Sequence, residues 1–174
     1  MRINRNEGFT LVEVMIITAV LSILVALAAP GISDLMDKNA VTSQANELMS
    51  NILVARSEAI KRERSIVIRR VNGWKDRYRV FVDLNANNNY NNATEKPIIV
   101  DNITPNNDVT ITGNGSFTTF IRFNSRGRAI IPSGSTFSPV TPNSDYLTVT
   151  KNGHTRYVCF SVTGRPRVQE AACS

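Results

Sequence analysis

The sequence contains little histidine and cysteine, two residue types that many enzymes use for catalysis. It has one histidine, His154, beside Gly153 in an expected turn, and no serine, histidine and aspartate triad can be built around it. Neither a zinc-type cluster of histidine and cysteine nor a phosphate-cradling GxxxxGK motif is present. We therefore expect no enzymatic activity, no catalytic residue, no metal site and no cofactor.

The asparagine-rich stretch at residues 83–94 is the nearest approach to a metal site. Asp83, Asn85, Asn87 and Asn89 alternate there as the ligands of a calcium loop do. A calcium loop also has a glycine at its sixth position for the sharp turn and a bidentate glutamate at its twelfth. Those two positions are occupied by asparagine and threonine, and Glu95 comes one residue late. A solvated hairpin loop is the better interpretation.

A long apolar run covers residues 9–29, and Glu13 is its only strongly polar residue. A helix of this length spans about 30 Å, which matches the hydrocarbon thickness of a bilayer. Arg2 and Arg5 precede the run, so the positive-inside tendency keeps the short leader cytoplasmic and sends the rest across the membrane. The run is too long for an ordinary signal peptide, and a plain signal anchor leaves Glu13 unexplained. A carboxylate at that depth costs about 2.5–3.5 kcal/mol, so Glu13 is a candidate functional residue.

Residues 8–13, GFTLVE, resemble the leader-cleavage motif of type IV prepilins and type II secretion pseudopilins. The resemblance implies that a prepilin peptidase cuts after Gly8 and that Phe9 becomes the N-methylated first residue. It also implies that Glu13 pairs with a neighbouring subunit and helps to set the register of filament assembly. The interpretation is physically sensible, because cleavage creates an amine and a buried carboxylate needs a nearby cation.

Cysteine is scarce and lies only near the C-terminus. Cys159 and Cys173 are both expected on the oxidising side of the membrane, where an even count favours a disulfide. Closing a loop of about 15 residues contributes roughly 3 kcal/mol in the chain-entropy model. The expected effect is to hold a C-terminal tail that would otherwise fray.

We expect Pro30-Gly31 to bend the helix without ending it. Apolar residues then recur at spacings of three and four, so the helix is expected to continue to about Lys61. This pattern predicts an amphipathic helix packed on one side. The sequence then becomes rich in β-branched residues and turn signals. Short strands are expected at residues 65–71, 77–82, 97–100, 109–111, 117–123, 128–131, 146–150 and 155–162, with a loop at 132–143. The predicted fold is α+β, with a mostly antiparallel sheet domain on one face of a long N-terminal helix.

Three later landmarks, FVDLN at 81–85, FNSRGRA at 123–129 and TGR at 163–165, resemble minor pilins of the FimT and FimU type and the related pseudopilin GspH. The resemblance implies a leader at 1–8, a transmembrane and filament-assembly segment at 9–30 and a periplasmic globular domain at 31–174. Implied partners are the inner membrane, the prepilin peptidase and other major and minor pilins. Assembly would carry the protein from the inner membrane to an extracellular pilus, at or near its tip.

Basic residues exceed acidic ones, 20 to 14, which suits polyanions or acidic partners without specifying either. Within the stretch Gly164-Arg165-Pro166-Arg167, the two arginines are two residues apart on an extended chain. They should therefore face the same side about 7 Å apart, where each can contact a phosphate. A salt-bridged edge is the alternative, because Glu170 is near. Further candidates for DNA contacts are Arg126, Arg128, Lys151 and Arg156.

The Gly-Arg-Pro-Arg stretch also resembles the GRxR motif of the FimT minor pilins that bind DNA in natural transformation. This resemblance implies sequence-independent, salt-sensitive binding of double-stranded DNA. Two other functions remain open at this stage. One is a structural minor pilin that primes assembly or joins the tip complex, as FimU-like proteins do, and the other is a GspH-like pseudopilin of type II secretion.

Overall fold

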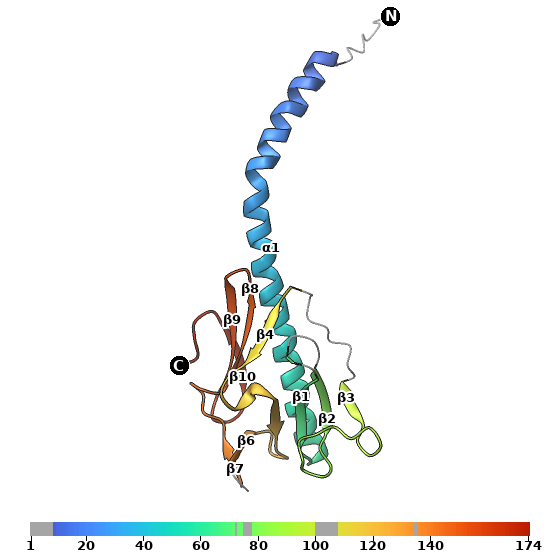
Figure 1. Cartoon of the computed structure of the whole chain (residues 1–174), viewed down its shortest axis with the longest axis vertical. Helices are drawn as coiled ribbons and strands as arrows, with labels where there is room; N and C mark the ends of the chain where they lie inside the picture. The colour runs from blue at the N-terminus through green and yellow to red at the C-terminus, as the bar shows by residue number, and fades with distance from the viewer. Residues whose placement is uncertain (1–8, 72, 75–77, 100–107, 134–135) are drawn as a thin grey trace, which may run out of the picture. The chain divides into compact units, whose positions relative to one another are not determined.

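The computed structural model describes residues 9–71, 73–74, 78–99, 108–133 and 136–174. It divides into two units, Met1–Met36 and Asp37–Ser174. One helix, α1 (Leu11–Arg62), belongs to both and is continuous through Pro30 and Gly31 (Figure 1). The expected end of the helix near Lys61 is confirmed.

The first unit begins with a reciprocal cap on α1. The backbone N–H of Thr10 donates to the Glu13 carboxylate over 3.0 Å, and the N–H of Glu13 donates to Thr10 Oγ1 over 3.2 Å. This is a capping box, which satisfies N–H groups at the helix start. Every side chain described from Phe9 to Leu27 is exposed. Among the described residues no single helix is both long enough and apolar enough to count as a membrane span. The two segments of α1 on either side of the Pro30 region, Leu11–Leu27 and Gly31–Arg62, meet the length and composition criteria only when they are taken together.

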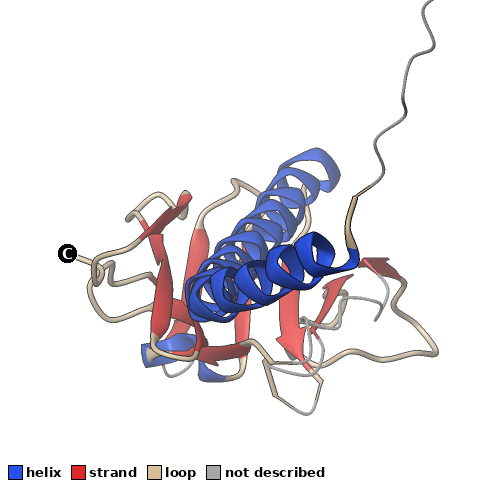
Figure 2. Ribbon diagram, turned by 90° about the horizontal axis from the view of Figure 1, so that it is seen from above, coloured by secondary structure: helices blue, strands red, loops and turns tan. Residues whose placement is uncertain are grey.

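In the second unit, one face of α1 is completely buried. Its buried hydrophobic residues are spaced alternately four and three apart, which is the period of one helix face. They are Val41, Ala45, Leu48, Ile52, Ala55 and Ala59. Leu53 and Val54 lie off this stripe and remain exposed. The stripe forms one hydrophobic core with side chains from two sheets. Figure 2 shows the strands, in red, on one side of the helix.

Both sheets are antiparallel throughout. The first has the order β3-β2-β1-β5-β6-β7 and the second β10-β9-β8-β4. The strands are β1 (Ile66–Arg70), β2 (Tyr78–Val82), β3 (Pro97–Ile99), β4 (Thr110–Gly113), β5 (Phe120–Phe123), β6 (Ala129–Ser133), β7 (Thr136–Pro139), β8 (Tyr146–Lys151), β9 (His154–Phe160) and β10 (Pro166–Gln169), with a short 3₁₀ helix η1 (Gly115–Thr118) before β5. The predicted α+β fold with a mostly antiparallel sheet domain is confirmed.

Two strands were not expected, and both lie at sheet edges. β7 falls within the stretch predicted as a loop and pairs with β6, and β10 follows the strand that was expected to close the domain. β7 ends at Pro139 and β10 begins at Pro166. Proline lowers the expectation of a strand, yet it is tolerated at an edge or at a strand's first residue, where no ladder N–H is needed.

The strand expected at residues 117–123 was placed too early, because η1 occupies its first residues. Phe117 is buried in η1, and its carbonyl accepts a hydrogen bond from Trp74 Nε1 over 2.8 Å. The indole therefore fixes a helical turn where the apolar pattern alone indicated an extended chain. Arg77, the first residue of the second expected strand, and Val100, the last residue of the third, lie outside the described residues.

The loop after β2 is organised by two buried carboxylates. Asp83 accepts backbone N–H groups of Asn87 and Asn88 and forms an ion pair with Arg122 over 2.6 Å. Glu95 accepts the N–H groups of Leu84 and Asn91. Both carboxylates are thus used by the protein's own donors. The Arg122 side chain is 5% exposed and that of Asp83 is 0% exposed, so this is a buried ion pair.

Replacing Asp83 by Ala is expected to lower the free energy of unfolding by about 3–5 kcal/mol, because Arg122 is left as a buried, uncompensated charge. Glu170→Ala is the matched control, since it breaks an ion pair with Arg156 in which the Glu170 side chain is 69% exposed. Its effect should be under about 1 kcal/mol. Urea unfolding of the full chain in detergent, followed by the fluorescence of the single tryptophan, measures both. Equal, small losses from the two variants would contradict the role given to Asp83.

Candidate nucleic-acid interface

Arg165 lies in the tight turn that joins β9 to β10. The N–H of Gly164 donates to the Ser161 carbonyl over 2.8 Å, and the N–H of Ser161 donates to the Arg165 carbonyl over 3.0 Å. Ser161 Oγ also accepts the N–H of Arg165. The turn's backbone is therefore held by three hydrogen bonds, and the Arg165 side chain is left exposed.

The two arginines of the stretch flank a buried proline. Pro166 pairs with Phe160 of β9 and is buried, whereas Arg165 and Arg167 are exposed. Both arginines line one open groove of about 570 Å³, together with Asn46 and Met49 of α1. The chain thus brings both guanidinium groups to one surface. No local sequence pattern predicts that α1 forms the other side of this groove.

Gly164 brings this turn against a second one. Its φ is +78°, which favours glycine, and a Cβ at this position would collide with the backbone nitrogen of Ala129. Ala129 is the first residue of β6 and directly follows Arg128. Only a residue without a side chain allows the two backbones to approach so closely.

The second turn, between β5 and β6, carries Arg126 and Arg128. Asn124 Oδ1 accepts the N–H groups of both arginines, and both side chains are exposed. The Gly127 carbonyl accepts a hydrogen bond from Arg56 Nε over 2.8 Å, which ties the turn to α1. The exposed arginines at 126, 128 and 165 therefore lie on two adjoining turns, and Arg167 lies in β10 just after the β9–β10 turn. We call these four residues the two-turn arginine cluster.

The other two predicted contacts, Lys151 and Arg156, are already paired with carboxylates. Lys151 Nζ lies 3.0 Å from Asp37 and 3.5 Å from Asp108. Arg156 forms an ion pair with Glu170. The pairings of Lys151 could not be predicted from the sequence, because its acidic partners are far from it along the chain.

The pairing of Lys151 with Asp37 also shifts the pKa of both groups. A hydrogen bond from Asn152 and a second from Lys151 lower the pKa of the Asp37 carboxyl, and the same Asp37 contact raises the pKa of Lys151. Each group thus stabilises the charged form of the other. The Lys151 ammonium is less available to a phosphate than a guanidinium that has no acidic partner.

The two cysteines form the expected disulfide. Cys159 and Cys173 are bonded, with Cα atoms 5.6 Å apart. Arg167 lies directly opposite Cys159 in the β9–β10 ladder, so the two side chains share a face of the sheet. The disulfide brings the tail to this face, where Arg167 Nη2 donates to the Ser174 carbonyl over 3.2 Å. The Arg167 guanidinium is therefore oriented by a main-chain oxygen of Ser174.

The N-terminal site residues are described only in part. Gly8 lies outside the described residues, and Phe9 is highly exposed, at 81%. Glu13 belongs to the capping box with Thr10. Sequence analysis missed this local role, although Thr10-x-x-Glu13 carries the usual capping-box signal.

Comparisons with known families cover both parts of the chain. Residues 44–164 match the family described as Type II transport protein GspH. Residues 3–29 match the prokaryotic N-terminal methylation motif. The first match covers more than half of the chain; it includes Arg126 and Arg128 of the two-turn arginine cluster and ends before Arg165 and Arg167.

Individual proteins agree with these matches. The chain is 28% identical over 171 residues to the pilin-like protein PilA1 of Thermus thermophilus, covering 94% of this chain and 99% of that protein. Two crystal structures of the type IV minor pilin FimU of Pseudomonas aeruginosa share its fold at 22% identity. One has a TM-score of 0.56 and covers 79% of this chain and 92% of that one; the other has a TM-score of 0.53 and covers 74% and 91%. The chain therefore belongs to the GspH family, carries the N-terminal methylation motif and shares the fold of the type IV minor pilin FimU.

Proposed function

We propose that this minor pilin binds double-stranded DNA, without sequence preference, through the two-turn arginine cluster and so promotes DNA uptake in natural transformation. Arg165 and Arg167 are the principal contacts, Gly164 permits their turn, and Arg126 and Arg128 extend the surface. Phosphate contacts of this kind release condensed counterions, so the affinity falls as salt rises.

The observation that supports the proposal most is the contrast between two groups of cations. Within the described residues no aspartate or glutamate side chain pairs with any arginine of the cluster, whereas Lys151 pairs with two and Arg156 with one. A cation that is already neutralised contributes little to the release of counterions. We therefore assign Lys151 and Arg156 a structural role and place the phosphate contacts at the cluster.

The proposal includes a path to the pilus. The prepilin peptidase cleaves after Gly8, Phe9 is N-methylated, and segment 9–30 holds the protein in the inner membrane. The domain at 31–174 is then periplasmic until assembly with other pilins carries it to the pilus, at or near the tip. In the filament, the Glu13 carboxylate pairs with the amine of a neighbouring subunit.

Cells that carry Arg165→Gln and Arg167→Gln on the chromosome should assemble pili normally and lose most of their DNA uptake. Both side chains are exposed, so the fold should be retained. Lys38→Gln with Lys96→Gln removes the same charge from two other exposed positions and serves as the matched control. Transformation frequency and the yield of sheared pili are the measurements. Normal uptake in the arginine variant would refute the DNA-uptake function.

A structural minor pilin is the second candidate, favoured by the shared fold with FimU. It would prime assembly or join the tip complex, and the arginine cluster would then dock on an acidic neighbouring subunit. The same experiment separates the two functions. Loss of pili in the arginine variant, with the control unaffected, would favour the structural role.

A further inference from the structure

The groove between α1 and β10 has an apolar floor that phosphate contacts alone do not use. Its volume is about 570 Å³, and its lining consists of Asn46, Met49, Ser161, Arg165, Pro166, Arg167 and Val168. Pro166 is buried, and Met49 and Val168 are half-buried, whereas both arginines and the asparagine are exposed. The floor of the groove is therefore apolar, and its rim carries two cations and an amide.

Residues 165–168 of the groove lie at an edge of the second sheet. β10 is the edge strand, and among the described strands its neighbour is β9. Side chains alternate between the two faces of an extended chain, so Pro166 and Val168 leave the opposite face from Arg165 and Arg167. At an edge both faces are accessible to one ligand. A single ligand can therefore contact the apolar pair and the cations together.

α1 forms the opposite wall of the groove through Asn46 and Met49, which lie one turn apart. Met49 follows the fully buried Leu48, so it lies at the margin of the stripe that packs in the core. Val168 packs against the same core. Both walls are thus held by the fold, and the groove is present without a ligand.

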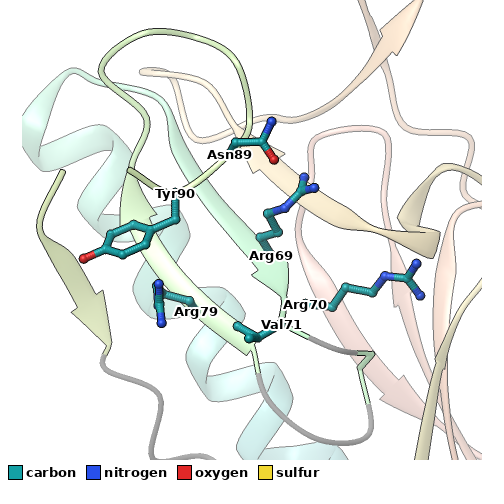
Figure 3. Close-up of a pocket in the computed structure, with 6 residues that line it drawn as sticks. All are labelled: Arg69, Arg70, Val71, Arg79, Asn89 and Tyr90. Atoms are coloured by element: carbon teal, nitrogen blue, oxygen red, sulfur yellow. The ribbon is translucent and has the colours of Figure 1, made fainter. Parts of the chain in front are cut away.

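A smaller basic pocket on the first sheet is built differently. It has a volume of about 200 Å³ and is lined by Arg69, Arg70, Val71, Arg79, Asn89 and Tyr90 (Figure 3). Arg69 and Arg70 are consecutive residues of β1, so their side chains leave opposite faces of the strand and diverge in Figure 3. Two cations that diverge cannot hold one ligand, so the groove beside β10 is the stronger candidate.

We propose that this groove holds one unpaired nucleobase of the bound DNA against its apolar floor, while Arg165 and Arg167 contact the flanking phosphates. The inference rests on the proposed function and adds a form of DNA that the same site prefers. A base inside a duplex is stacked on both faces and cannot reach the floor. The nucleotide must therefore come from a strand end, a gap or an overhang, where unpairing costs least.

The size and chemistry of the groove suit a nucleotide. Its volume lies within the roughly 300–1,000 Å³ of pockets that hold small organic ligands. The Met49 thioether makes favourable contacts with aromatic rings, and guanidinium groups match the oxygens of phosphate. Arg126 and Arg128 continue the line of cations on the adjoining turn, which favours a polyanionic strand over a peptide with one acidic side chain.

The first test compares three duplexes on the full chain in non-ionic detergent. One is blunt, one carries a thymidine overhang, and one carries an abasic overhang with the same number of phosphates. The parent should bind the thymidine overhang about three- to tenfold more tightly than the abasic one, because only the first supplies a base. Equal affinities for these two overhangs in the parent would overturn the proposal.

Met49→Gln assigns the gain to the floor of the groove. Glutamine keeps the length and the helical propensity of methionine but removes its apolar surface. This variant should lose the preference for the thymidine overhang and keep the blunt-duplex affinity, which also shows that it is folded. Leu53→Gln is the matched control, because Leu53 lies one turn further along α1, is 41% exposed and does not line the groove. An unchanged preference in Met49→Gln would contradict the assignment.

Methionine methyl signals in NMR spectra locate the base directly. The chain has four methionines, and the signal of Met49 is the one that disappears in Met49→Gln. Trithymidylate should shift this signal through the ring current of the base, and the abasic trimer should not. A shift caused by the acidic tripeptide glutamyl-leucyl-glutamate and not by trithymidylate would overturn the proposal in favour of a protein partner.

The blunt duplex separates the failure of this inference from the failure of the proposed function. Salt-sensitive binding of the blunt duplex, with equal affinities for the two overhangs, would remove the base site and leave the proposed function intact. Loss of all blunt-duplex binding, with a Met49 shift on addition of trithymidylate, would refute duplex binding and support the base site.

Discussion

Under the proposed function, replacing Glu13 by Ala is expected to abolish incorporation of the protein into pili while leaving it in the membrane. The carboxylate lies in an apolar helical segment, and a charge there is costly unless a cation accompanies it. In the proposed assembly that cation is the amine of a neighbouring subunit. Immunoblots of the sheared pilus fraction and of the membrane fraction give the measurement.

The capping box requires a control, because Glu13 also caps its own helix through Thr10. Glu13→Gln keeps the cap, since glutamine serves equally in a capping box, but it removes the charge. Thr10→Ala disrupts the cap and keeps the charge. If charge pairing is the role, the glutamine variant should be excluded from pili and Thr10→Ala should be incorporated. Normal incorporation of Glu13→Gln would contradict the pairing.

The helix and the general nature of the sheet domain could be predicted from local sequence patterns. The buried positions of α1 alternate in steps of four and three because one face packs on the core, and that period is visible in the residues themselves. Strands such as β1 and β8 are rich in β-branched residues. These elements depend on local composition, which the sequence states directly.

The edge strands could not be predicted in the same way. β7 and β10 each contain a proline, and their pairing depends on β6 and β9 being in place first. The position of η1 depends on Trp74, whose indole donates to a residue far along the chain. Such contacts between distant segments override local preference.

Recognition of the arginine pair at 165 and 167 needed only its spacing, but the environment of the pair needed the fold. The close approach of Gly164 to Ala129 joins two turns that are far apart in sequence. The ion pairs of Lys151 and Arg156 distinguish these two candidates from the arginines of the cluster, which composition alone could not do. The sequence thus indicated cations, and the fold distinguishes those with acidic partners from those without.

Replacing Arg165 and Arg167 by Gln should therefore weaken DNA binding in a specific manner. Each phosphate contact that is lost removes one released counterion, so the log-log dependence of affinity on salt should become shallower by about two. The loss should be the same for unrelated duplexes, because phosphate contacts carry no sequence information. Lys38→Gln with Lys96→Gln removes equal charge at exposed positions away from the cluster and should leave the slope close to that of the parent.

The most direct test of the DNA-binding surface is the salt dependence of duplex affinity for the detergent-solubilised full chain, its arginine double variant and the lysine control. We predict binding by the parent that falls steeply as salt rises, with the slope reduced by about two only in the arginine variant. No binding by the parent at low salt, or equal slopes in the parent and in a folded arginine variant, would contradict the assignment of DNA binding to Arg165 and Arg167.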